Sequence, residues 1–212
     1  MSVPRIDPAS GNRAMPASQR AEPDLYESHP ILINALMGHV ELPQEIWEPA
    51  AGKRAIVDVL EAGGHSVLAT DKFDHGASGI ITGQDFLAER PIAHPRCIVT
   101  NPPFNIAPQF VERALDVADV SYFLLRMQFV NRGTSRHLMK HMTGFFPFAP
   151  RPPRMHADGW EGPRAGGTGD YAWFRFSRHT TGICDCRPIY WRDYVQAPTP
   201  TLTPDLFEKE TA

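Results

Sequence analysis

Residues 97–108 read CIVTNPPFNIAP, an apolar run that ends in an asparagine, two prolines and an aromatic residue. The apolar run predicts a buried strand. Pro102 and Pro103 remove two backbone donors and fix φ at two successive residues, and Pro102 also restricts Asn101. The sequence therefore predicts a stiff loop at a strand end. This loop opens with an amide and closes with the ring of Phe104, which suits it to hold a small flat group.

Strand-like and helix-like stretches alternate on both sides of this loop. The predicted strands are residues 45–48, 66–71, 96–101, 121–127, 144–150 and 170–178, and the predicted helices are residues 30–37, 53–62, 108–118 and 133–142. Such an alternation is typical of an α/β fold whose strands form a right-handed wound, mostly parallel sheet.

The 212 residues are enough for one folding unit. We expect a domain over residues 24–195, between tails at residues 1–23 and 196–212. Both tails are rich in Pro and Ser or Thr and lack apolar periodicity, which predicts disorder. Inside the domain, the loop at residues 150–170 is unusually long, and such loops often carry function.

Composition excludes some classes of protein. With 21 basic and 24 acidic residues the net charge is -3, so the whole surface does not attract nucleic acid, although a local basic patch is compatible with it. The three cysteines cannot all pair, and no signal peptide or long apolar run is present, so we expect a reduced, cytoplasmic protein without a membrane span. Cys184 and Cys186 lack partners at metal-ligand spacing, which favours surface thiols and no metal. The oligomeric state stays open.

Acidic or amide side chains follow successive predicted strands. The segments are WEPAAGK (47–53), TDKFD (70–74), GQDF (83–86) and TNPPF (100–104). In an open parallel sheet, ligands bind beyond the carboxyl ends of the strands. The four segments therefore predict one shared ligand site. Taken singly, Asp71 is more often a helix cap or turn residue and Asp85 a loop carboxylate, so each prediction rests on the position relative to a predicted strand.

In these segments the chain resembles the Class I S-adenosylmethionine-dependent methyltransferases, and more narrowly the phage and prophage DNA adenine-N6 methyltransferases, over roughly residues 25–178. The resemblance implies a Rossmann-like fold with a mostly parallel seven-stranded sheet and an antiparallel last strand. It also implies S-adenosyl-L-methionine as the cofactor. The cofactor-binding residues that it implies are Tyr26, Glu48, Pro49, Ala50, Gly52, Asp71, Asp85, Phe86 and Asn101.

The resemblance assigns these residues to different parts of the cofactor. The E-P-x-x-G loop from Glu48 to Gly52 would contact the methionine part of the cofactor. Asp71 would hold the ribose hydroxyls, and Asp85 with Phe86 would meet the adenine.

The catalytic residues that the resemblance implies are Asn101, Pro102, Pro103 and Phe104. The exocyclic nitrogen of adenine is a poor nucleophile because its lone pair is delocalised into the ring. Two acceptors, the Asn101 side-chain oxygen and the Pro102 carbonyl, would favour a pyramidal nitrogen and stabilise the charge that develops. Phe104 would stack on the target ring, and a base in duplex DNA would have to be flipped out to reach it.

The expected partner is DNA, with short or relaxed sequence specificity. Its candidate contacts in the long loop are Arg151, Arg154, His156, Trp160 and Arg164, a basic and aromatic mixture suited to phosphates and bases. The alternative reading of these arginines is a merely solvated surface. Arg126, at the end of an apolar strand, either faces the site or forms an ordinary ion pair.

Two other functions stay open. The Asn-Pro-Pro-aromatic chemistry also serves adenine-N6 or guanine-N2 methylation in RNA, because both bases present a planar conjugated amine. Further, Gly52 is followed by Lys53 and Arg54 where the family often has G-x-G, which leaves a side chain where the backbone approaches the cofactor. This departure keeps open a catalytically inactive module that only binds nucleic acid.

Overall fold

The computed structural model describes residues 27–88, 95–152, 169–180 and 182–195. The two predicted tails and most of the predicted 150–170 loop lie outside these residues. The strands are β1 (Glu45–Glu48), β2 (Ser66–Ala69), β3 (Cys97–Thr100), β4 (Val120–Arg126), β5 (Met142–Ala149), β6 (Tyr171–Ser177), β7 (Asp185–Cys186) and β8 (Ile189–Tyr190). The α-helices are α1 (Pro30–His39), α2 (Ala55–Ala62) and α3 (Ala107–Val117), and the 3-10 helices are η2 (Met127–Asn131), η3 (Gly133–His141) and η4 (Trp191–Tyr194).

The strands form one sheet in the order β2-β1-β3-β4-β6-β5-β7, with β8 paired to β5. Strands β2, β1, β3 and β4 are parallel, and β6 runs antiparallel between β4 and β5. The predicted α/β fold with a Rossmann-like, mostly parallel sheet is confirmed. The described sheet has eight strands because β7 and β8, which contain two residues each, add to the edge at β5. Sequences this short carry no strand signal.

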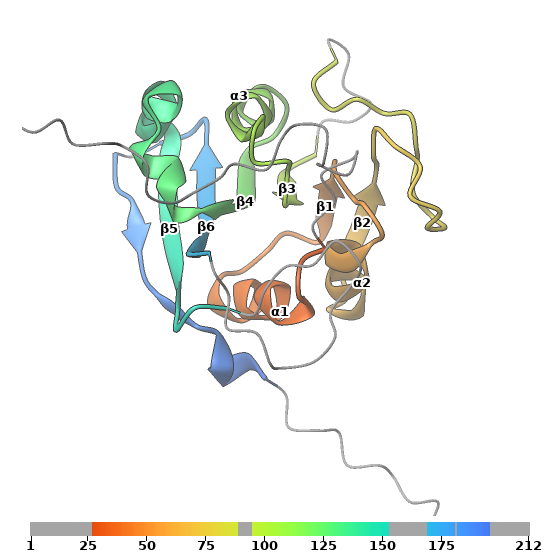
Figure 1. Ribbon diagram of the computed structural model, residues 1–212, viewed down its shortest axis with the longest axis horizontal. Coiled ribbons are helices and arrows are strands. Elements are labelled where there is room, and N and C mark those ends of the chain that lie inside the picture. Colours follow the sequence, from red (N-terminus) through yellow and green to blue (C-terminus); the bar gives the residue numbers. More distant parts are fainter. Residues whose placement is uncertain (1–26, 89–94, 153–168, 181, 196–212) are drawn as a thin grey trace, which may run out of the picture.

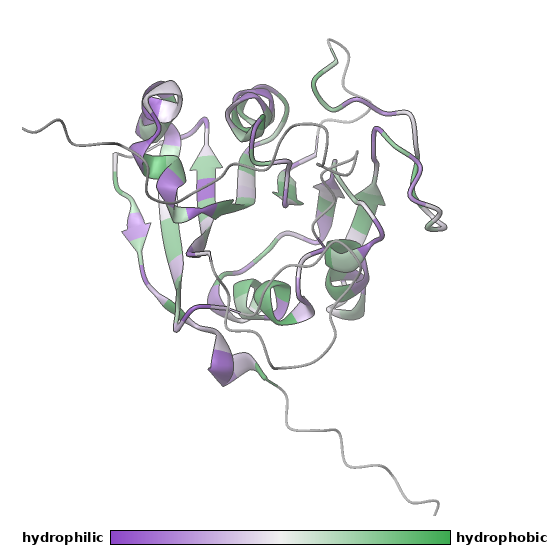
Figure 2. Ribbon diagram, viewed as in Figure 1, coloured by the Kyte–Doolittle hydropathy of each residue, from purple (hydrophilic) through white to green (hydrophobic). Residues whose placement is uncertain are grey.

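Helices cover both faces of the sheet (Figure 1). One core cluster joins α1 and α2 to side chains such as Cys97 and Val99, and a second joins α3 and η3 to Ile98 on the opposite face of β3. All four residues of β3 are buried, as expected for a strand covered on both sides. Hydrophobic residues accordingly lie along the strands and on α1 (Figure 2).

The predicted helix at residues 133–142 is the 3-10 helix η3. Its first three residues, Gly133, Thr134 and Ser135, have low α-helix propensity, which favours the tighter turn. Ser135 and Leu138 are buried three residues apart and fasten one edge of η3 to the core.

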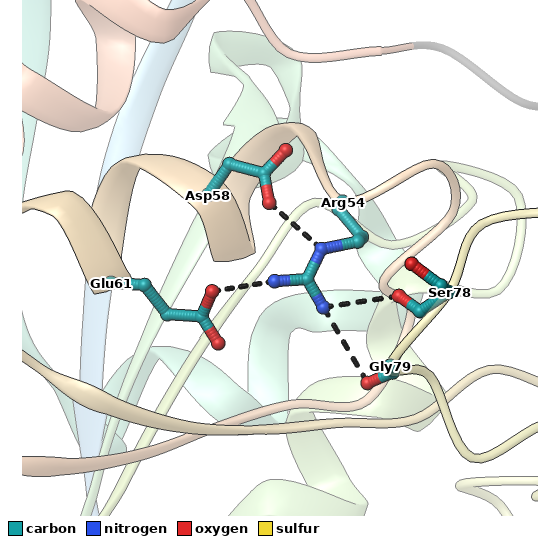
Figure 3. A network of polar contacts seen from close by, with 5 residues as sticks. All are labelled: Arg54, Asp58, Glu61, Ser78 and Gly79. Carbon is teal, nitrogen blue, oxygen red and sulfur yellow. Dashed lines mark hydrogen bonds and ion pairs between the residues drawn. The ribbon is translucent and has the colours of Figure 1, made fainter.

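The start of α2 has an unusual backbone conformation at Arg54. This N-cap residue has φ 75° and ψ 12°, a left-handed conformation that glycine adopts more easily. Its guanidinium binds Asp58 Oδ1 at 2.8 Å and Glu61 Oε2 at 2.5 Å, and it also donates to the carbonyls of Ser78 and Gly79 (Figure 3). These contacts offset the backbone strain and join α2 to the segment after β2.

Replacing Arg54 separates the strain from the contacts. Arg54→Ala removes the contacts but keeps a Cβ at positive φ, whereas Arg54→Gly removes both. We expect Arg54→Ala to unfold more easily than Arg54→Gly by about 1 kcal/mol in urea titrations. The control is Arg96→Ala, because Arg96 is exposed and its ion pair with Asp119 is long, at 3.9 Å. Equal stability of the two Arg54 variants would contradict this account of the strain.

Candidate functional site

A cavity of about 160 Å³ opens at the carboxyl ends of β1, β2 and β3. Its wall contains eight residues that the sequence predicts for the site: Pro49, Ala50, Gly52, Asp71, Asp85, Phe86, Asn101 and Pro103. The predicted residues Tyr26, Arg154, His156, Trp160 and Arg164 lie outside the described residues. A second hollow of about 410 Å³, at the amino end of β4, contains none of the predicted site residues.

Asp71 holds the first two loops of the cavity together. Its Oδ2 accepts a hydrogen bond from the Gly52 backbone N at 2.8 Å, and its Oδ1 accepts one from the Phe73 backbone N at 2.8 Å. The carboxylate is nearly buried, and Gly52 has φ 55°, a value that glycine adopts without strain. Because a carboxylate oxygen accepts more than one hydrogen bond, Asp71 keeps acceptor capacity for a hydroxylated ligand.

The third loop contributes a charged group and an aromatic wall. Asp85 forms an ion pair with Lys72 at 2.9 Å, and the hydrogen bond from Lys72 holds the pKa of Asp85 below its usual range. Phe86 is buried and packs edge-on against Trp47, with ring centroids 5.2 Å apart, and against Phe110 at 5.0 Å. This part of the wall suits a flat ligand ring with polar groups at one edge.

Asn101 reaches the cavity from the end of β3. Its Nδ2 donates a hydrogen bond to the Ser28 hydroxyl at 3.0 Å, and Ser28 is almost completely buried just before α1. In this orientation the amide presents Oδ1 as its acceptor. Sequence analysis did not identify Ser28, which also lines the cavity, although its place shortly after Tyr26 and before a helix was a usable signal.

Phe104 lies beside the cavity rather than in its wall. Its ring packs against Tyr171 with centroids 5.9 Å apart, and the Arg126 guanidinium lies 5.0 Å from its ring centroid. The Arg132 guanidinium donates to the Phe104 carbonyl at 2.8 Å. Arg126 thus contacts the N-P-P-F loop and forms no ion pair with the residues that the structure describes.

Two other predicted residues also lie outside the cavity wall. Pro102, within the N-P-P-F loop, is buried and is not part of the wall. Arg151 is exposed and forms an ion pair with Asp170 at 2.6 Å, just before β6.

Lys53 and Arg54 occupy different environments. Lys53 lines the cavity and lies 3.9 Å from Glu27 Oε1, so its charge has an acidic neighbour. Arg54 is absent from the wall and binds Asp58 and Glu61 instead. Arg54 stands where the resembling family often has the second glycine of G-x-G, but its side chain does not fill the cavity.

Glu48 differs from its predicted position, because it is fully buried and does not line the cavity. Its Oε1 accepts hydrogen bonds from Thr100 Oγ1 at 2.5 Å and from the Ala50 backbone N at 3.0 Å. These bonds tie the end of β1 to the end of β3, below the cavity floor. Burial raises the pKa of Glu48 from 4.5 to about 8, against the opposing effect of the two hydrogen bonds.

The raised pKa of Glu48 gives a testable pH dependence. The unfolded carboxyl releases its proton near pH 4.5 and the folded one near pH 8, so this group makes folding less favourable as the pH rises through that window. Glu48→Gln mimics the protonated form. We expect the variant to gain stability over the unchanged chain between about pH 5 and pH 8, by a few kcal/mol at most.

Denaturant unfolding of both chains across this pH range checks the expectation. Burial lowers the pKa of His29, so this group makes folding more favourable as the pH rises, which is the opposite of the Glu48 effect. Because both chains contain His29, the difference in their unfolding free energies is the quantity to compare. Parallel stability curves would contradict a raised Glu48 pKa.

Within the described residues, no group of three or more His, Cys, Asp or Glu side chains is arranged to hold a metal ion. The helices in the same part of the chain are all too short or too polar to cross a lipid bilayer.

No model of a known protein family matches this chain, and no curated protein matches it. Solved structures do. A protein described as a predicted O-methyltransferase from Agrobacterium tumefaciens superposes with a TM-score of 0.53 at 11% identity, over 76% of this chain and 86% of that one. A protein from Vibrio vulnificus, described as a modification subunit of a type I restriction enzyme, gives a TM-score of 0.50 at 13% identity, over 79% of this chain and 47% of that one. The chain thus has the Rossmann-like fold of these structures.

Proposed function

We propose that this chain transfers a methyl group from S-adenosyl-L-methionine to the exocyclic N6 amine of adenine in DNA. The observation that carries the proposal is the common cavity of Asp71 and Asn101. The Asp71 carboxylate suits the ribose hydroxyls of the cofactor, and the Asn101 amide suits the target amine. One cavity therefore brings the groups for cofactor and target base together. The fold alone does not identify the methyl acceptor, because proteins of one fold catalyse many different reactions.

The cavity fits the cofactor in its chemistry. The wall contains the acidic side chains of Glu27, Asp71 and Asp85 and also two lysines, and this mixture suits a ligand that carries hydroxyls, an ammonium, a carboxylate and a sulfonium. Phe86 and Ile106 add apolar surface for an adenine ring. When bound, the cofactor supplies a methyl group activated by the positive sulfur.

Asn101 would act on the target amine. Its Oδ1 would accept a hydrogen bond from an N–H group of the amine and so favour a pyramidal nitrogen with an available lone pair. An amide takes up no proton at neutral pH, so the transfer is direct and the extra proton of the product leaves to solvent. Ser28 is a positioning residue, since its hydroxyl accepts the hydrogen bond from Asn101 Nδ2 and thereby fixes the orientation of the amide.

A base in duplex DNA would have to leave the stack to reach Asn101. Phe104 directly follows Pro103, which lines the cavity, and Arg126 lies over its ring, so the base would pass this pair on its way to Asn101. The cation above the Phe104 ring and the Tyr171 ring beside it keep this aromatic surface in place. Stacking on such a surface offsets part of the unpairing energy, which is a few kcal/mol.

Ser28→Ala tests the positioning role. Loss of the hydroxyl removes the acceptor for Asn101 Nδ2, so kcat should fall about tenfold, which corresponds to one hydrogen bond of about 1.4 kcal/mol. Cofactor affinity, measured by calorimetry, should change little, and Ser28→Thr should restore most of kcat because it keeps a hydroxyl. An equal loss of cofactor affinity and kcat, without rescue by threonine, would contradict positioning.

The function itself is tested by transfer of labelled methyl groups to unmethylated duplex DNA, with bulk RNA in parallel, followed by nucleoside analysis. We expect label in N6-methyladenine of DNA and a loss of about a hundredfold or more in Asn101→Ala. Asn105→Ala is the matched control, because Asn105 is exposed in the same loop and absent from the cavity wall. Its activity should be unchanged.

The other possible results of this experiment distinguish between the two alternative functions. Label in RNA alone would move the substrate to RNA, where the same amine chemistry applies. Absence of label in both polymers, together with absence of cofactor binding in calorimetry, would overturn the enzyme and leave the nucleic-acid-binding module.

A further inference from the structure

Basic residues are concentrated in the segment that follows the candidate site. Residues 120–152 contain five of the 21 basic residues and none of the 24 acidic ones, although the whole chain has a net charge of -3. The five are Arg126, Arg132, Arg136, Lys140 and Arg151, and all are exposed. Charge of one sign on a chain of the opposite net sign indicates a local surface for a polyanion.

The core holds this segment in place. Phe129 anchors η2 and Leu138 anchors η3, because both side chains are buried in the core cluster under α3. η3 contacts α3 and lies beside it at the same end of the sheet (Figure 1). The positions that remain outside include Arg136 and Lys140, whose charges are therefore presented from a fixed support.

Part of the segment contacts the N-P-P-F loop directly. β4, which leads into η2, pairs with β3, the strand that ends just before Asn101. The Arg132 guanidinium donates to the Phe104 carbonyl, and the Arg126 guanidinium lies over the Phe104 ring. The basic surface thus begins at the loop that would hold a target base and extends away along η3.

Arg136 and Lys140 form no ion pair with any residue that the structure describes. The acidic group that contacts η3 is Glu112 of α3, and among the described residues its Oε1 lies 2.6 Å from His137 Nε2. Two cations on a fixed helix without an ionic partner in the described part of the chain favour binding of an external anion over an internal structural role.

We infer that Arg136 and Lys140 bind backbone phosphates of the nucleic acid that delivers its base to Asn101. This inference rests on the proposed function and names the surface that its substrate uses. Phosphate contacts position a nucleic acid without reading its sequence. The surface would therefore hold the strand on one side of the cavity and leave the choice of base to the N-P-P-F loop.

The experiment is binding of a labelled duplex DNA by fluorescence anisotropy between about 50 and 200 mM salt. The double variant Arg136→Ala with Lys140→Ala should bind more weakly at every salt concentration. The slope of log Kd against log salt should fall by about 1 for each side chain removed. The matched control is Arg96→Ala with Arg192→Ala, which removes the same charge from exposed positions before β3 and in η4, and it should bind like the unchanged chain.

A labelled RNA hairpin serves as a second probe, because phosphates are common to both polymers. A double variant that binds both probes like the control would overturn the inference, and so would an unchanged chain that binds neither. Thermal unfolding of each variant shows that the fold is retained.

The methyl-transfer assay on the same preparations separates this inference from the proposed function. If the unchanged chain transfers methyl groups and the double variant binds like the control, only the inference fails. If binding depends on Arg136 and Lys140 but no methyl group is transferred, the phosphate-binding role of these two residues stands and the proposed function fails.

Discussion

The parallel pairing of β1 with β2 and β3 is the constraint on which the candidate site depends. Parallel strands place their carboxyl ends at one edge of the sheet, so the loops after these strands meet although the sequence separates them. β3 is buried on both faces, which prevents it from shifting in register without exposing apolar side chains. The cavity is thus a consequence of sheet geometry before any polar contact is considered.

Buried polar contacts then set the shape of that edge. Asp71 accepts hydrogen bonds from the backbone N–H groups of Gly52 and Phe73, and Glu48 accepts one from the Thr100 hydroxyl and one from the Ala50 backbone N–H. The two carboxyl groups differ in their surroundings. Asp71 reaches the cavity, whereas Glu48 lies below it without a partner for Oε2 among the described residues, and burial raises its pKa. One carboxyl is therefore available to a ligand and the other holds two strands.

The N-P-P-F loop connects two surfaces of different chemistry. On one side Asn101 faces a cavity whose wall mixes acidic, basic and apolar side chains, and on the other side Phe104 is held by Arg126 and Arg132. A cofactor with a cationic centre and a polyanionic substrate need opposite charges around them. For the proposed function, Arg126 and Arg132 supply the positive side of this requirement, and the Asp71 carboxylate supplies the negative side within a cavity of mixed charge.

Strands β1 to β6 were predictable from sequence, because their apolar runs are local and bounded by turn residues. The strand-end segments with Asp71, Asp85 and Asn101 were predictable for the same reason. The 3-10 form of η3 was not, since the choice between two helix types depends on how Ser135 and Leu138 meet the core. The two-residue strands β7 and β8 were also missed, because so short a pairing has no pattern.

By itself, the sequence determined the order of strands and helices and the polar residues at the strand ends, because periodicity and turn chemistry are local properties. Only the tertiary structure decided that Ser28 orients Asn101 across 73 residues, and that Glu48 lies beneath the cavity. It also decided that Arg54 points away from the cavity. These features depend on which distant atoms meet and how much water they lose, and no local pattern records either quantity.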